Sequence, residues 1–288
     1  MNARQPVAAR RRSTRKFVWT IALLVCVAFL PQFAWGEPVR LGGTGAALAT
    51  MRLIGDALRK DDPQFAFEIV PNLGSGGGLQ ALKRDAIHVA VISRALNKEE
   101  EAAGLRAFEY GKTPFVLATA KKNGPGVSLD QIAEIYSGKR ATWVDGTPIR
   151  LVLRPANDSD TSALAAFSPA VKQALAHAHA REGLMIAVTD QDAADQIMRL
   201  PGGLGTASLS LILSEDRALL ALPIDGVAAS VQNLATGTYP YAKSMYLVVK
   251  GEPQGAPARF LQFVRSAKGR KILAATGHWT GDVSSPAK

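Results

Sequence analysis

Small hydroxyl and glycine residues stand at four places where an apolar run ends and a segment of helical spacing begins. These places are Gly42-Gly43-Thr44-Gly45-Ala46, Gly74-Ser75-Gly76-Gly77-Gly78, Ser93-Arg94 and Asp158-Ser159-Asp160-Thr161. The backbone N–H groups and the dipole of a helix N-terminus attract anions, and glycine lets the backbone approach a ligand closely. Two of the places have a guanidinium group nearby, from Arg94 and Arg154. Convergent donors of this kind suit a small tetrahedral oxyanion.

Each place taken alone has a simpler interpretation, because a Ser, Thr or Asp before a helix is more often an ordinary N-cap. We favour the anion site because four similar helix starts occur in one chain. In an open α/β sheet such loops gather beyond the carboxyl ends of the strands, where ligands bind.

The glycine runs do not fit the motifs of nucleotide sites or hydrolases. Gly43-x-Gly45 begins like a dinucleotide fingerprint, but the third position is Leu48. The run at Gly74 lacks the Gly-Lys-Ser/Thr ending of a phosphate-binding NTPase loop. It also has no glycine two residues before its serine, as a nucleophile elbow requires.

Histidines and aromatic residues give no sign of catalysis or metal binding. His177 and His179 are two apart on a predicted helix, so they point to different faces and make a poor metal pair. We expect Tyr136 and Trp143 to pack in the core. The sequence therefore predicts a protein that is not an enzyme and needs no metal or other cofactor.

The segments that must position these residues alternate between strand and helix along the chain. Strand-like runs cover 38–42, 65–70, 88–93, 114–122, 149–154, 183–190, 202–208, 217–224 and 244–250. Helical spacing covers 46–60, 77–85, 97–104 (capped by Asn97), 128–139 (capped by Ser128), 161–180 and 258–277. This alternation predicts an α/β protein with mainly parallel sheets.

The first 36 residues have the layout of a secretory signal peptide. Six basic residues precede a short apolar stretch, FVWTIALLVCVAFL, and a small-residue site follows at Ala34-Trp35-Gly36. An uncleaved N-terminal anchor is the alternative. The only cysteine, Cys26, lies in the apolar stretch, so the rest of the chain has no disulfide or thiolate chemistry.

Charge gives little support to nucleic-acid binding. The net charge is +10, but the six positive charges before Glu37 leave only +4 for the rest. That balance is ordinary for a chain of 288 residues, which is long enough for one large or two medium domains.

Several segments, in order, resemble the periplasmic phosphate-binding proteins of ABC-type transporters. They include GGTGA, GSGGGLQAL, VISRALNKEE, LDQIAEIYSGKRATWVDGTPIRLVLR, PGGLGTASLSLI, TYPYAKSMYLVVK and FLQFVRSAKGRKIL. The resemblance implies two α/β lobes, each a mostly parallel sheet flanked by helices, with the anion in the cleft between them. Residues 37–119 and 241–288 would form one lobe and residues 120–240 the other.

The resemblance also implies binding roles for Thr44, Ser75, Arg94, Ser159 and Thr161. Together with the helix starts, the candidate ligand-binding residues are Thr44, Gly45, Ser75, Gly76, Ser93, Arg94, Arg154, Ser159, Asp160 and Thr161.

This chain departs from the family at one turn. The family usually has an Arg followed by Gly-Ser-Gly-Thr, whereas here the turn is Asp158-Ser159-Asp160-Thr161 and Arg154 stands one residue early. Asp158 or Asp160 could accept a hydrogen bond from the proton that phosphate carries near neutral pH. The same carboxylate would repel sulfate, which has no proton to donate. In the simpler alternative, one Asp caps the helix and the other faces water.

The resemblance implies a periplasmic, monomeric protein that binds phosphate or a related oxyanion and delivers it to a membrane ABC permease. An exported sensor of the same fold that signals to a membrane receptor is the alternative. A hydrolase of phosphorylated substrates is disfavoured, because no nucleophile–base pair stands out.

Overall fold

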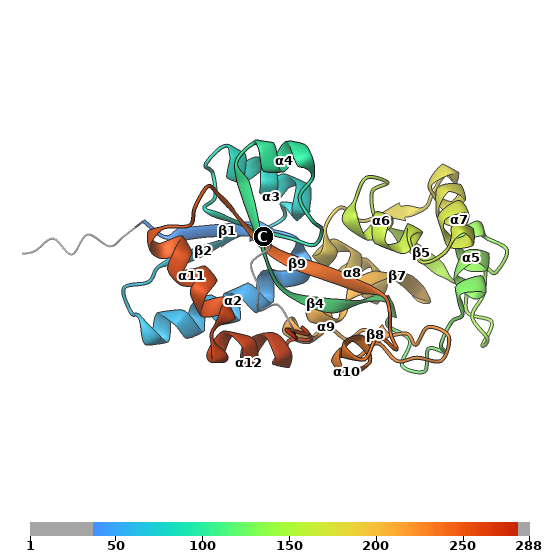
Figure 1. Cartoon of the computed structure of the whole chain (residues 1–288). Helices are drawn as coiled ribbons and strands as arrows, with labels where there is room; N and C mark the ends of the chain where they lie inside the picture. The colour runs from blue at the N-terminus through green and yellow to red at the C-terminus, as the bar shows by residue number, and fades with distance from the viewer. Residues whose placement is uncertain (1–36, 282–288) are drawn as a thin grey trace, which may run out of the picture. The chain divides into compact units, whose positions relative to one another are not determined.

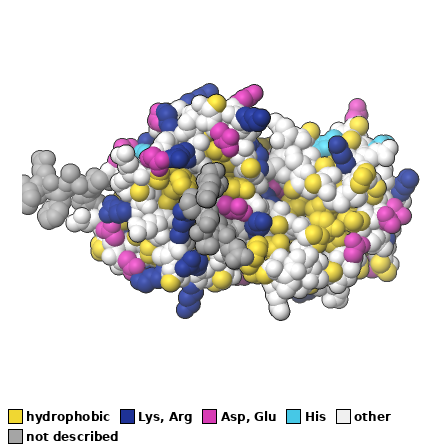
Figure 2. All heavy atoms as spheres, in the orientation of Figure 1, with side chains coloured by type: hydrophobic (Ala, Val, Ile, Leu, Met, Phe, Trp, Pro, Cys, Tyr) yellow, Lys and Arg dark blue, Asp and Glu magenta, His cyan; other side chains and the backbone are white. Residues whose placement is uncertain are grey.

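The computed structural model describes residues 37–281, which belong to one compact unit. The predicted signal peptide lies outside the described residues. Between residues 37 and 281 no helix has the length and hydropathy needed to span a membrane. On the face shown in Figure 2, Lys and Arg side chains are interspersed with Asp and Glu side chains.

Within the part of the chain that the structure describes, nine strands form one mixed sheet. They are β1 (Val39–Gly43), β2 (Phe67–Val70), β3 (Val89–Ile92), β4 (Leu105–Thr119), β5 (Arg150–Leu153), β6 (Met185–Ile186), β7 (Gly203–Ser208), β8 (Leu220–Ala221) and β9 (Ala242–Lys250). Their order is β2-β1-β3-β9-β4-β7-β5-β6, with β8 beside β4. The strands within β2-β1-β3 and within β7-β5-β6 are parallel, as predicted. By contrast, β4 and β9 run antiparallel to every neighbour.

The helices of the described residues are, in chain order, α2 (Gly45–Asp61), α3 (Gly74–Lys83), α4 (Lys98–Ala102), α5 (Leu129–Ser137), α6 (Ser159–Ala165), α7 (Pro169–Ala180), α8 (Asp190–Arg199), α9 (Leu209–Ser214), α10 (Val231–Ala235), α11 (Gly255–Arg265) and α12 (Ala267–Ala275). Figure 1 shows α3 and α4 on one side of β1, and α2, α11 and α12 on the other. Helices thus cover both faces of this part of the sheet.

Two long helices predicted from the sequence are each broken into two. The segment 161–180 divides before α7, because Pro169 at its first position lacks an N–H and the Ser168 hydroxyl accepts from Val171 N at 3.1 Å. The segment 258–277 divides at Ser266, whose hydroxyl accepts from Gly269 N at 3.1 Å. In both cases a serine N-cap starts a new helix where apolar spacing suggested continuity.

The long strand β4 passes from one core cluster to another. Tyr110 of β4 packs in a cluster with α2 and α11, whereas Phe115 of the same strand packs in a cluster with α5 and α7. Polar residues interrupt the first half of β4, which is why the sequence pattern did not indicate it. The lobe boundaries at residues 119 and 241 stay a prediction.

Glycine lets three elements meet at the end of β1. Gly43 has φ +144°, and a Cβ there would lie 1.9 Å from the carbonyl oxygen of Val91 on β3. A Cβ on Gly78 of α3 would lie 2.9 Å from the Cα of Gly43. Larger residues would separate α3 from β1 and β3, so these glycines set the spacing at the ends of the strands.

Candidate functional site

Three serine hydroxyls from distant parts of the chain meet at the ends of the strands. The Oγ atoms of Ser75 and Ser93 are 3.4 Å apart, and those of Ser93 and Ser159 are 3.1 Å apart. Ser75 Oγ also accepts a hydrogen bond from Ser93 N at 3.2 Å. We call Ser75, Ser93 and Ser159 the hydroxyl cluster. It lies at the starts of α3 and α6 and at the end of β3, as the sequence predicted.

Thr44 stands at the neighbouring strand end. β1 and β3 are parallel neighbours, and Thr44 N donates to Val91 O at 2.8 Å, which ties the start of α2 to the end of β3. The Thr44 hydroxyl donates to Asp190 Oδ2 at 3.2 Å. Gly45 and Gly76 lie within the first turns of α2 and α3.

The simple N-cap interpretation does not hold for these hydroxyls. Thr44 makes no side-chain capping bond to α2, and α3 likewise has no side-chain cap. The helix after Ser93, α4, is capped by Asn97, and α6, which begins at Ser159, is capped by Asp158. The first-turn N–H groups of α2 and α3 therefore have no cap from their own N-cap side chains, which is the state of a helix N-terminus that receives an anion.

Arg94 is not brought into the hydroxyl cluster. Its guanidinium donates to both carboxylate oxygens of Glu100, at 2.8 and 2.7 Å, and to Ala95 O at 2.9 Å. The hydrogen bonds from Arg94 lower the pKa of Glu100, which also accepts from Asn97 N in a capping box. The guanidinium thus stabilises the start of α4.

Arg154 is buried and also paired. It donates to Ala187 O at 2.9 Å and to Asp158 Oδ2 at 3.1 Å. Asp158 in turn caps α6, accepting from Asp160 N at 2.8 Å. The simpler prediction for one Asp of the turn is therefore correct. The Thr161 hydroxyl donates to Pro155 O at 2.8 Å, so it holds the turn together.

Asp160 does not face water as the simpler alternative predicted for the second Asp. It is 1% exposed, forms an ion pair with Lys243 and accepts from Thr206 Oγ1 at 3.3 Å. Burial raises the pKa of Asp160, while the Lys243 ammonium opposes that rise. Asp190 Oδ1 lies 3.8 Å from Lys243 Nζ.

We call Arg154, Asp158, Asp160, Asp190 and Lys243 the charged cluster. Sequence reasoning missed two of its members. Asp190 follows Thr189 at the end of a strand-like run, so this place also combines a hydroxyl and an acid. It could have been compared with the four helix starts singled out in the sequence. Lys243 gave no signal, because a single lysine in a strand normally faces solvent.

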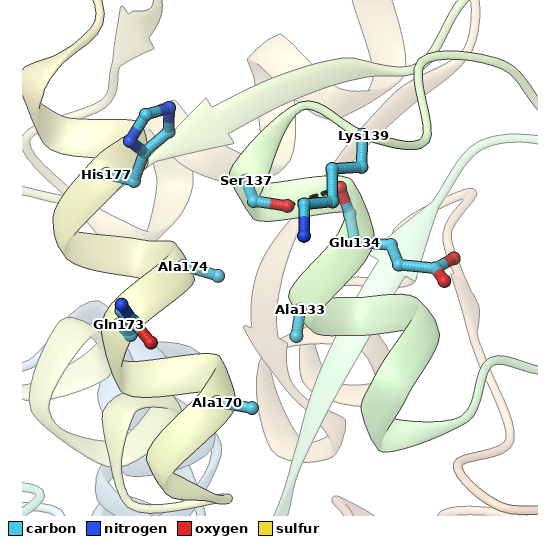
Figure 3. Close-up of a pocket in the computed structure, with 8 residues that line it drawn as sticks. All are labelled: Ala133, Glu134, Ser137, Lys139, Ala170, Gln173, Ala174 and His177. Atoms are coloured by element: carbon cyan, nitrogen blue, oxygen red, sulfur yellow. Dashed lines mark hydrogen bonds between the residues drawn. The ribbon is translucent and has the colours of Figure 1, made fainter.

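A groove between α5 and α7 is less suited to a small anion than the hydroxyl cluster is. It has a volume of about 370 Å³ and is lined by alanines and by Glu134, Lys139, Gln173 and His177 (Figure 3). The one hydrogen bond drawn there runs from the Ser137 hydroxyl to the backbone carbonyl of Glu134, at 3.0 Å. Within residues 37–281 no group of His, Cys, Asp and Glu side chains could hold a metal ion.

Comparisons with known proteins agree with this architecture. A family model described as a PBP superfamily domain matches residues 11–268. The chain is 27% identical to the phosphate-binding protein PstS of Bacillus subtilis (strain 168) over 245 residues, which covers 81% of this chain and 77% of the relative.

Solved structures share the fold. A phosphate ABC transporter substrate-binding protein from Clostridium perfringens, solved with bound phosphate, matches with a TM-score of 0.73 and 23% identity, covering 85% of this chain and 99% of the other. The periplasmic molybdate-binding protein of Azotobacter vinelandii matches with a TM-score of 0.61 and 12% identity, covering 84% of this chain and 98% of the other. The predicted two-lobed α/β fold is thereby confirmed.

Proposed function

Because the chain belongs to the PBP superfamily, we propose that it is an exported, non-enzymatic solute-binding protein that binds phosphate and delivers it to a membrane ABC permease. The Bacillus subtilis relative that it resembles over most of its length is a phosphate-binding protein. The proposal includes export through residues 1–36, a monomer in the periplasm, and lobes formed by residues 37–119 with 241–288 and by residues 120–240.

The meeting of hydroxyls from distant helix starts carries this proposal. Ser75, Ser93 and Ser159 can each donate to one oxygen of a tetrahedral anion. The first turns of α2 and α3, which have no cap from their own N-cap side chains, add backbone N–H donors. Thr44 stands beside them. Neutral donors of this kind hold a buried anion without a counter-ion, because each oxygen receives hydrogen bonds in a site from which water is excluded.

The contact between Ser93 and Ser159 supports a closing mechanism. These residues are 66 apart in sequence and belong to different predicted lobes, and their Oγ atoms are 3.1 Å apart. A ligand that accepts from both would favour the closed form over an open one, and a membrane partner could recognise that form.

The test is calorimetric titration of the full chain with phosphate, after bound ligand has been removed. We expect Ser159→Ala to raise the Kd about 10- to 100-fold, because the loss of a hydrogen bond to a charged ligand costs about 1.5–3 kcal/mol. Arg94→Ala is the matched control, since it lies next to Ser93 but pairs with Glu100; its Kd should stay within about twofold of wild type. Absence of phosphate binding by the wild type would refute the proposal.

A further inference from the structure

The start of α8 lies directly against the start of α2. Gln191 Nε2 donates to Gly45 O at 3.0 Å, across 146 residues of sequence. A Cβ on Gly45 would lie 2.1 Å from Gln191 Oε1 and 2.9 Å from Asp190 Cβ. There is no space for even a methyl group between the two helix starts, so Asp190 is held at the first turn of α2.

In this position the carboxylate of Asp190 lies at the first turn of α2. Its Oδ2 atom accepts from the Thr44 hydroxyl at 3.2 Å. A backbone hydrogen bond from Ala46 also favours its charged form. The two side chains are buried, with Thr44 2% and Asp190 6% exposed. Because α2 has no side-chain cap of its own, Asp190 takes the place that a bound anion would otherwise take.

Asp190 is also the third carboxylate of the charged cluster, which has only two cations. Arg154 pairs with Asp158, and Lys243 pairs with Asp160. Asp190 then remains as a third carboxylate, with its nearest cationic atom, Lys243 Nζ, 3.8 Å away. The cluster therefore places three carboxylates and only two cations beside the proposed phosphate site.

The surroundings keep Asp190 ionised. Burial alone would raise the pKa of Asp190, but the ammonium of Lys243 and the guanidinium of Arg154 lower it by stabilising the charged carboxylate. The hydrogen bonds from Thr44 and Ala46 act in the same direction, and together these interactions lower the pKa of Asp190. At neutral pH the group at the start of α2 is thus a carboxylate.

We infer that the Asp190 carboxylate is an internal ligand of the anion site, which occupies the start of α2 until phosphate displaces it. The inference rests on the proposed function, since it needs phosphate to bind at these helix starts. A carboxylate and a phosphate oxygen require the same donors, and two anions repel each other strongly in a buried site. If the carboxylate occupies these donors about 90% of the time, the apparent phosphate affinity falls about tenfold.

Asp190→Asn tests the inference in the full chain, because it keeps the size of the side chain and removes the charge. We expect calorimetry at pH 8 to give a phosphate Kd at least about tenfold lower than that of the wild type. The matched control is Asp195→Asn, which makes the same charge change on the same helix but at a residue paired with Arg217. That control should bind phosphate as the wild type does. If Asp190→Asn does not fold, Asp190→Ser should show the same tightening.

The outcomes separate this inference from the proposed function. Wild-type binding with unchanged or weaker binding by Asp190→Asn would overturn the inference alone. Weaker phosphate binding with stronger sulfate binding would mean that Asp190 accepts the proton of phosphate, which also overturns it. Binding by Asp190→Asn but not by the wild type would support the inference that Asp190 competes for the site, and would refute phosphate delivery as the function of the wild-type chain. If neither binds phosphate, both fail.

Discussion

At the scale of single residues, Lys243 and Asp160 form an ion pair in the interior of the protein. Both side chains are 1% exposed, and the Phe115 ring lies 5.6 Å from the Lys243 ammonium. Buried charges are costly to desolvate, so removal of one partner leaves the other uncompensated. Replacing either residue alone should therefore destabilise the folded protein, because the charge of the other residue stays buried without its partner.

Lys243→Met should lower the free energy of unfolding by about 3–5 kcal/mol, because it leaves Asp160 buried without its cation. Denaturant unfolding monitored by circular dichroism measures the change. Lys250→Met is the control on the same strand, since its pair with Asp85 is exposed and should contribute less than about 1 kcal/mol. Equal effects of the two substitutions would contradict the burial argument.

At the scale of elements, the site depends on how closely helix starts and strand ends approach. Gly43 and Gly78 bring β1, β3 and α3 together, and Gly45 brings α2 against α8. At these positions an ordinary side chain would force the elements apart. The helix starts converge because glycines let the backbones of these elements pack closely. The hydroxyl groups at the helix starts come together as a result.

Gly45→Ala should lower the free energy of unfolding by about 1–3 kcal/mol, although alanine is the better helix former, because its Cβ would collide with Gln191 and Asp190. Gly77→Ala is the control in α3, where the added Cβ would meet Leu73 at an ordinary 3.6 Å. That control should stabilise the protein by up to about 1 kcal/mol. Thermal and denaturant unfolding of both variants measure the difference, and a stabilised Gly45→Ala would contradict this account.

At the scale of the whole molecule, the C-terminal part of the chain is tied to the long strand β4. Trp279 exchanges backbone hydrogen bonds with Lys112, and the His278 ring packs 5.7 Å from that of Tyr110. His278 is 1% exposed, and burial lowers its pKa to about 4. The folded protein therefore holds this histidine neutral where an unfolded chain would protonate it.

This difference predicts a loss of stability in mild acid. The unfolded chain, with a histidine pKa near about 6.5, binds more protons than the folded state, so the free energy of unfolding falls as the pH drops. The loss attributable to His278 should approach about 1.4 kcal/mol per pH unit between about pH 6 and 4, and reach about 3 kcal/mol in total. Denaturant unfolding at a series of pH values should show that the free energy of unfolding depends less steeply on pH in His278→Gln than in the wild type. His177→Gln, at an exposed histidine, should behave as the wild type.

Local structure and the presence of hydroxyl groups at helix starts could be predicted from the order of residues. Strand and helix alternate as the apolar spacing predicted, and Asn97 and Ser128 cap their helices as predicted, because both properties depend on residues within a turn of each other. The breaks at Ser168 and Ser266 carry local capping signals too, although apolar spacing concealed them. The hydroxyls at the helix starts could likewise be read from the order of residues.

The partner of each charged group, by contrast, depends on how distant segments pack together. Arg94 and Arg154 were predicted to bind an anion, yet their guanidinium groups lie on Glu100 and Asp158. Lys243 meets Asp160 across 83 residues, and Thr44 meets Asp190 across 146. A charge acts on whatever the fold places within a few ångströms of it, so pairing depends on distances that residue order does not specify. The sequence could therefore predict an anion site at these helix starts, while the carboxylate that competes for it became visible only when distant segments were in place.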